Sequence, residues 1–94
     1  MQRTLANISQ IQFDSLKSAV KQRFGTDFEG NAAEVESHGF RTGIQYDPTS
    51  QEVVITLLKK PWLVPESLVE RKVDAWLSQH GPTWLGPDYV LRKG

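Results

Sequence analysis

The sequence predicts an α+β fold in which a helix is followed by three strands and a second helix. Two segments, 10–24 and 65–80, repeat apolar residues at the spacing of one helix face, and the three segments between them read as strands. Turn-forming glycine, proline and aspartate residues separate the segments. The order α-β-β-β-α packs most simply as a three-stranded antiparallel meander with both helices on one face.

The first helix is predicted over 10–24 by signals at both of its ends. Ser9 and Gln12 have the spacing of a capping box, in which each side chain accepts from the other residue's free backbone N–H. Gly25 follows the last apolar residue, where a left-handed residue commonly ends a helix. The apolar stripe between these ends consists of Phe13, Leu16, Val20 and Phe24.

The first two strands are predicted over 33–37 and 40–46 from alternating polar and apolar residues. His38 and Gly39 are expected to form the turn between them. Asp47 to Ser50 then provides the next turn, because aspartate accepts from the backbone ahead and proline presets φ.

The third strand, 52–59, carries apolar residues on both faces, and Pro61 ends it because proline cannot continue a ladder. As the last strand of a three-stranded sheet it would be an exposed edge, which recruits other chains. One face consists of Val53, Ile55 and Leu57, and the other of Val54 and Leu58.

The second helix is expected to begin at Pro65 and to end at His80, before the pair Gly81-Pro82. Its inward stripe consists of Val69, Val73, Trp76 and Leu77. An acidic line on this helix, Glu66, Glu70 and Asp74, either faces the basic line Lys17 and Lys21 of the first helix or is solvated independently of it.

The length of 94 residues predicts one domain, 1–94, with an N-terminal extension at 1–8 and an aromatic-rich tail at 82–94. Eleven basic and 11 acidic residues cancel, so the chain has no net field to attract phosphate, and nucleic acid is not expected as a partner. The absence of cysteine excludes disulfides, thiolate metal sites and a thiol nucleophile. No signal peptide and no transmembrane segment is recognisable, which predicts a cytoplasmic protein.

No arrangement of residues identifies a catalytic, cofactor or metal site, so we do not expect an enzyme. His38 and His80 lie beside glycines at predicted element ends, without a nucleophile nearby. Glu34 and Glu36 share a strand face and are typical of a polar face in water. Phosphate-binding, zinc-protease and hydrolase motifs are absent from the sequence.

The unusual apolar residues lie in the corner Pro61-Trp62-Leu63-Val64-Pro65 and in the tail. The corner either closes the core as a buried turn or stands exposed as an aromatic ledge that a ligand, partner or apolar surface would meet. The tail either packs on the open sheet face of its own chain or crosses to another chain. The candidate interaction surface consists of Val53, Val54, Trp62, Leu63, Trp84, Leu85 and Tyr89.

The stretches Val20–Gly25, Gly39–Gly43 and Ile55–Leu77 resemble the small bacterial polyhydroxyalkanoic-acid-system family. The resemblance rests on glycine positions, the proline–aromatic corner and the apolar spacing of the second helix. It implies a bacterial protein, often encoded near polyester-storage genes, and a family without established catalytic residues. The tail from Pro82 has no counterpart in the family.

Three functions remain open on the sequence. The first is a non-catalytic binding or assembly module that forms a homodimer or docks on an apolar partner surface. The second is a small ligand-binding or enzymatic domain with a pocket between helices and sheet, for which Thr42 and Tyr46 are the polar candidates. The third is an accessory protein of a storage-granule or phage assembly.

Overall fold

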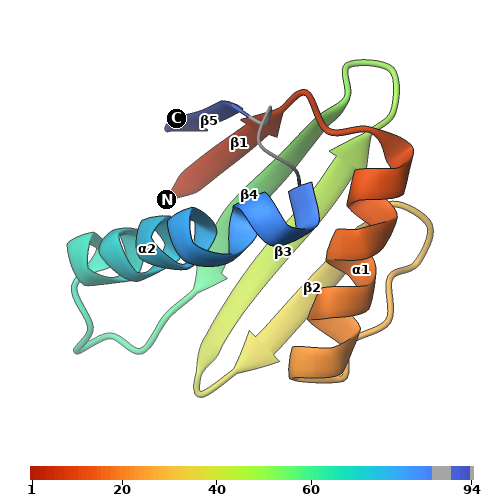
Figure 1. Cartoon of the computed structure of the whole chain (residues 1–94). Coiled ribbons are helices and arrows are strands. Elements are labelled where there is room, and N and C mark those ends of the chain that lie inside the picture. Colours follow the sequence, from red (N-terminus) through yellow and green to blue (C-terminus); the bar gives the residue numbers. More distant parts are fainter. Residues whose placement is uncertain (86–89, 94) are drawn as a thin grey trace.

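The computed structural model describes the backbone of residues 1–85 and 90–93 and the side chains of residues 1–79 and 90–92 (Figure 1). It confirms an α+β fold, but the sheet has five antiparallel strands rather than three. The elements in chain order are β1 (Gln2–Ala6), α1 (Gln10–Phe24), β2 (Ala32–Ser37), β3 (Phe40–Asp47), β4 (Glu52–Lys59), α2 (Glu66–Leu85) and β5 (Val90–Lys93).

The two additional strands come from the segments that the sequence suggested were an extension and a tail. The strand order is β2-β3-β4-β1-β5, so β1 lies between β4 and β5. Strands β2, β3 and β4 form the expected meander within this larger sheet. The segment 1–8 shows little strand pattern because Leu5 is the one large apolar residue inside β1 and its inward neighbour is Arg3.

Strand β4 is therefore central, and the expectation that it is an exposed edge is wrong. Its residues pair with β3 on one side and with β1 on the other, so that Val53 lies opposite both Tyr46 and Leu5. The apolar residues on its covered face are explained by this central position, since both neighbouring strands bring buried residues beside them.

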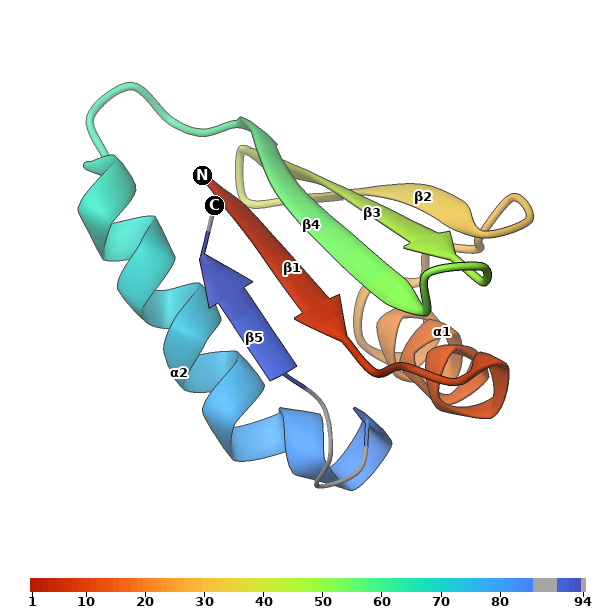
Figure 2. The ribbon, with the colours of Figure 1, turned by 90° about the horizontal axis from the view of Figure 1, so that it is seen from above.

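Both helices lie on the same face of the sheet and contact each other (Figures 1 and 2). Helix α1 has the predicted bounds: both hydrogen bonds of the Ser9–Gln12 capping box form, and Gly25 ends the helix at φ 70°. The core between the helices and the sheet contains Leu5, Ile8, Phe13, Leu16, Val20, Val35, Ile44, Tyr46, Val53, Ile55 and Leu77. Val73 and Trp76 of the predicted α2 stripe pack against this core while partly buried.

Helix α2 continues through Gly81-Pro82 to Leu85, so the end predicted at His80 is wrong. Proline lacks one N–H, whose usual acceptor would be the carbonyl four residues earlier. A helix of 20 residues retains its other backbone bonds, and a single missing bond near its end does not force the chain to leave the helix.

The acidic line on α2 faces strand β1, not the lysines of α1. Arg3 Nε donates to Asp74 Oδ1 at 2.8 Å, and Arg3 Nη2 lies 3.8 Å from Glu70 Oε1. The Met1 ammonium donates to Glu66 and lowers the pKa of that carboxyl. Lys17 and Lys21 pair instead with Asp14 and Asp27, at 3.5 and 2.9 Å.

Candidate interaction surface

Trp62 and Leu63, which we call the apolar tip, are the most exposed part of the corner between β4 and α2. Their exposed fractions are 85 % and 74 %, so the corner is an exposed ledge and not a buried turn. The loop projects at the edge of the molecule in both ribbon views (Figures 1 and 2). Large apolar side chains this exposed and adjacent are a common feature of contact sites.

The loop that carries the apolar tip is held by hydrogen bonds on both sides. The Val64 N–H donates to the Pro61 carbonyl at 3.0 Å, and Lys60 Nζ donates to the Val64 carbonyl at 2.7 Å. Pro65 follows directly, and its carbonyl accepts the first N–H bond of α2, from Leu68. A turn closed in this way presents the tip in a defined position.

The hairpin turn between β2 and β3 contacts the same loop. A Cβ atom built on Gly39 would lie only 3.2 Å from Pro61 Cγ, so the backbone of the turn approaches the proline ring closely. His38 and Gly39 both have positive φ, 54° and 84°, as the predicted turn requires. The His38 ring is exposed, and its Nδ1 lies 2.8 Å from Ser37 Oγ.

Basic side chains gather at the base of the apolar tip. Lys59 is exposed and lies opposite Arg41 in the β3–β4 ladder, and Lys60 follows it in the loop. Arg41 Nη2 pairs with Glu36 Oε1 at 2.9 Å, which offsets its charge. Lys59 and Lys60 therefore supply a local positive excess at this end of a chain that is neutral as a whole.

The face of the sheet that the helices leave uncovered is mostly polar. Val54 lies on it between Gln45 and Thr4, and Thr56 lies opposite Gly43. Leu58, which is 50 % exposed, is the large apolar residue of β4 closest to solvent.

The remaining residues of the candidate surface are either buried or outside the described side chains. Val53 is fully buried under the helices, so its assignment to an exposed surface is wrong: its neighbour Val54 points the other way because side chains alternate along a strand. Trp84, Leu85 and Tyr89 lie outside the side chains that the structure describes.

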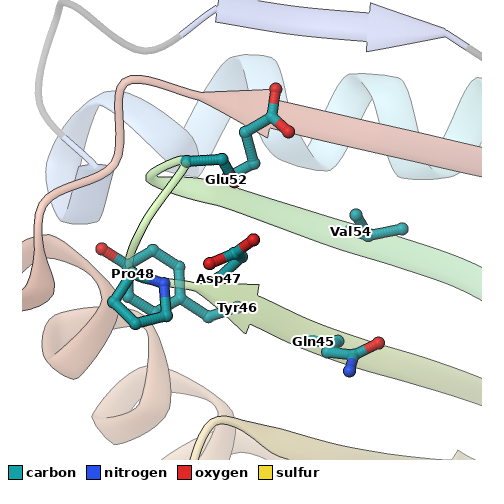
Figure 3. Close-up of a pocket in the computed structure, with 7 residues that line it drawn as sticks. Gln45, Tyr46, Asp47, Pro48, Glu52 and Val54 are labelled. Carbon is teal, nitrogen blue, oxygen red and sulfur yellow. The ribbon is translucent and has the colours of Figure 1, made fainter.

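A shallow depression of about 380 Å³ lies at the hairpin between β3 and β4 (Figure 3). Both of its carboxylates already have partners: Asp47 Oδ1 accepts the Thr49 N–H at 2.9 Å, and Glu52 pairs with Arg92. These carboxylates therefore serve the turn and the packing of the sheet. The lining residues are Gln45, Tyr46, Asp47, Pro48, Ser50, Glu52 and Val54.

The polar groups in the interior are also engaged in structure. The buried Tyr46 hydroxyl donates to the Ile8 carbonyl at 2.7 Å, its ring stacks on Phe13, and burial raises the pKa of the phenol. Among the described residues no group of three or more metal-ligating side chains comes together. Tyr46, which the sequence offered as a polar group for a pocket, therefore holds the Ile8 backbone in place.

No protein-family model, no curated protein and no solved structure matches this chain. None of the helices in the described part of the chain combines the length and apolar character that crossing a bilayer requires.

The sequence marked the corner that carries the apolar tip but left open whether it is exposed, and it did not connect the corner with the basic residues beside it. Lys59 and Lys60 were visible as a doublet, whereas Arg41 joins them only through the ladder register. The register depends on an irregularity between Arg41 and Thr42, which no sequence signal marks. Leu58 was placed correctly on the face opposite Val53.

Proposed function

We propose that this protein is a non-catalytic docking module that binds an apolar partner surface through Trp62 and Leu63. The observation that carries the proposal is the exposure of these two adjacent side chains, 85 % and 74 %, on a loop closed by hydrogen bonds. Exposing this much apolar area is unfavourable in water, and binding removes the cost. A rigid presentation lowers the entropy lost on binding.

The contact can be tested by retention on immobilised octyl chains. The double variant Trp62→Ser and Leu63→Ser should elute clearly earlier than the wild type. Leu63→Ser and Ile11→Ser form a matched pair, because Ile11 is 79 % exposed on the distant helix α1. The proposal is contradicted if Leu63→Ser and Ile11→Ser reduce retention equally, since any exposed apolar residue would then suffice.

Self-association as a homodimer is the second candidate. Leu58 at 50 % exposure and the partly buried Val54 support it, because both lie on the face of the sheet that the helices leave open. Strand β4 is central and cannot pair as an edge, so in this candidate the contact is assigned to the open face of the sheet. A symmetric contact of more than ~1,000 Å² would be required.

Sedimentation velocity over a wide concentration range tests the dimer. Val54→Lys should give a folded monomer of half the parent mass, whereas Ile11→Lys, the control on α1, should sediment like the parent. A parent chain that remains monomeric up to near-millimolar concentration would exclude the dimer.

The alternative of a ligand-binding or enzymatic domain is less favoured by the geometry. The Tyr46 hydroxyl that it would use is bound to the Ile8 carbonyl in the core. A cytoplasmic location, membership of the polyhydroxyalkanoic-acid-system family and a role in a storage-granule or phage assembly remain proposals. Each of them is compatible with a docking module that has no nucleic-acid partner.

A further inference from the structure

We propose that the surface on which this protein docks is an anionic lipid bilayer, into which Trp62 and Leu63 insert while Lys59 and Lys60 face the head groups. This inference rests on the docking function proposed above and names the chemistry of the partner. It combines three observations: the exposure of the apolar tip, its place on a projecting loop, and the cations at its base.

The composition of the apolar tip suits the boundary between head groups and acyl chains. Tryptophan has an apolar ring system and one polar N–H, and it is enriched at membrane interfaces for that reason. Leu63 beside it is purely aliphatic and 74 % exposed. Insertion of such a pair needs no complementary pocket in the partner.

The charges around the apolar tip favour an anionic surface. Lys60 and Lys59 precede Trp62 by two and three residues. The charge of Arg41, which lies opposite Lys59, is offset by Glu36. Glu66 pairs with the Met1 ammonium, which together with the Lys60 charge lowers the pKa of that carboxyl, so the positive charge of Lys59 and Lys60 is not cancelled by it. A positive excess within a Debye length of the tip is attracted to anionic head groups.

A second copy of this chain is a poorer occupant of the same tip. A tryptophan side chain buries ~150–250 Å², so two tips meeting would bury ~300–500 Å² from this residue. Even with Leu63 added, this area falls well short of the ~1,000 Å² that a stable protein interface needs. A bilayer has no such requirement, because it closes around whatever inserts.

Vesicle co-sedimentation with the full chain tests the proposal. The wild type should bind phosphatidylcholine vesicles that contain phosphatidylglycerol, bind pure phosphatidylcholine vesicles far less, and dissociate at high salt. Trp62→Ser with Leu63→Ser should reduce partitioning by more than ~tenfold, in view of the apolar area removed. Ile11→Ser should leave partitioning unchanged.

A second pair of variants tests whether the lysines beside the apolar tip contribute to membrane binding. Lys59→Gln should weaken partitioning by about fivefold, the effect of one cation near an anionic membrane surface. Arg23→Gln makes the same change in net charge at an exposed position on α1 and should have no effect. If the two variants weaken binding equally, attraction depends on net charge alone and the assigned orientation is wrong.

Quenching by brominated lipid reports insertion separately from binding. Trp62→Phe keeps a large apolar side chain and should still sediment with vesicles, but the emission should lose the lipid-dependent quenching seen in the wild type. Because the tip is exposed, each variant should melt at the wild-type temperature, which excludes unfolding as the cause.

The outcomes distinguish this inference from the proposed function. If octyl retention depends on the apolar tip but no vesicle binds, the docking function stands and the lipid assignment is overturned in favour of a protein surface. If vesicles bind regardless of the tip variants, the lipid assignment is overturned as well. If neither octyl chains nor vesicles depend on the tip, both proposals fail.

Discussion

Arg3 joins strand β1 to helix α2 through a buried charge. The residue is 4 % exposed, and its guanidinium donates to both carboxylate oxygens of Asp74, at 2.8 and 3.3 Å. Hydrogen bonding to Asp74 raises the pKa of this arginine, so it stays ionised. A buried charge needs such a partner, and the acidic line of α2 supplies it.

Arg3→Met tests this residue, because methionine keeps much of the apolar stem and removes the charge. Breaking a fully buried pair costs ~3–5 kcal/mol. The Asp74 side chain is 23 % exposed and water screens it, so we expect a smaller loss of ~1–3 kcal/mol. Urea unfolding measures the loss, with Arg23→Met on α1 as the control. Equal stability of the two variants would contradict the role of the pair.

Tyr46→Phe should lower the free energy of unfolding by about 1 kcal/mol, because the Ile8 carbonyl loses its donor. Burial raises the pKa of Tyr46, so the folded state favours the neutral phenol. This contribution is fully present below the unfolded pKa of ~10 and is lost as pH rises through the folded pKa. The gap between wild type and variant should therefore shrink in alkaline urea titrations. A gap that is constant above pH ~10 would contradict the prediction.

At the scale of elements, the β2–β3 turn supports the loop that carries the apolar tip. Gly39 has φ 84° and approaches the Pro61 ring, so it meets two constraints at once. Gly30 has a similar φ of 64°, but a Cβ atom built on it would have no neighbour within 4 Å. Both positions therefore require a residue that tolerates positive φ, but only Gly39 also requires the absence of a side chain.

Gly39→Ala should therefore destabilise the protein more than Gly30→Ala. Both variants place alanine in the left-handed region, which costs ~1–2 kcal/mol. Only Gly39→Ala also introduces a methyl group 3.2 Å from Pro61 Cγ, and the loop must shift to admit it. Thermal unfolding compares the two variants. If they melt at the same temperature, the turn and the loop are not coupled.

At the scale of the whole molecule, the two ends of the chain complete the sheet. Strand β1 pairs with β4 and with β5, and Leu5 lies opposite both Val53 and Leu91. Leu5 is fully buried, although the residues around it show no strong strand pattern. Without β5 the sheet would end at β1, which would then expose a row of unpaired backbone groups.

Truncation after Leu85 should destabilise the protein and make it prone to aggregation. Losing the Leu91 contact and uncovering Leu5 would cost up to ~1.5–3 kcal/mol, the value of one buried aliphatic side chain. A loss of ~2 kcal/mol lowers the Tm of a domain this size by roughly 8–16 °C. Val90→Thr, at an exposed position of β5, is the control and should melt near the wild type. An unchanged Tm after truncation would show that β5 contributes nothing.

Local chemistry determined much of the architecture in advance. The capping box at Ser9, the left-handed Gly25 and the alternation in β3 act within a few residues, so the bounds of α1 and the meander β2-β3-β4 could be predicted. The corner at Pro61 was also visible, because proline has no N–H to donate and cannot continue a central ladder.

Long-range pairing decided the rest. Strand β1 is held in place by the ladders of β4 and β5 and by the ion pair between Arg3 and Asp74. These partners lie 48 to 90 residues away in the chain. The exposure of Trp62 was equally open, since the same residues fit a buried or an exposed corner. Sequence alone determined that an apolar corner exists; only the packing of the surrounding elements decided that it faces solvent, because burial depends on what covers a residue and not on its identity.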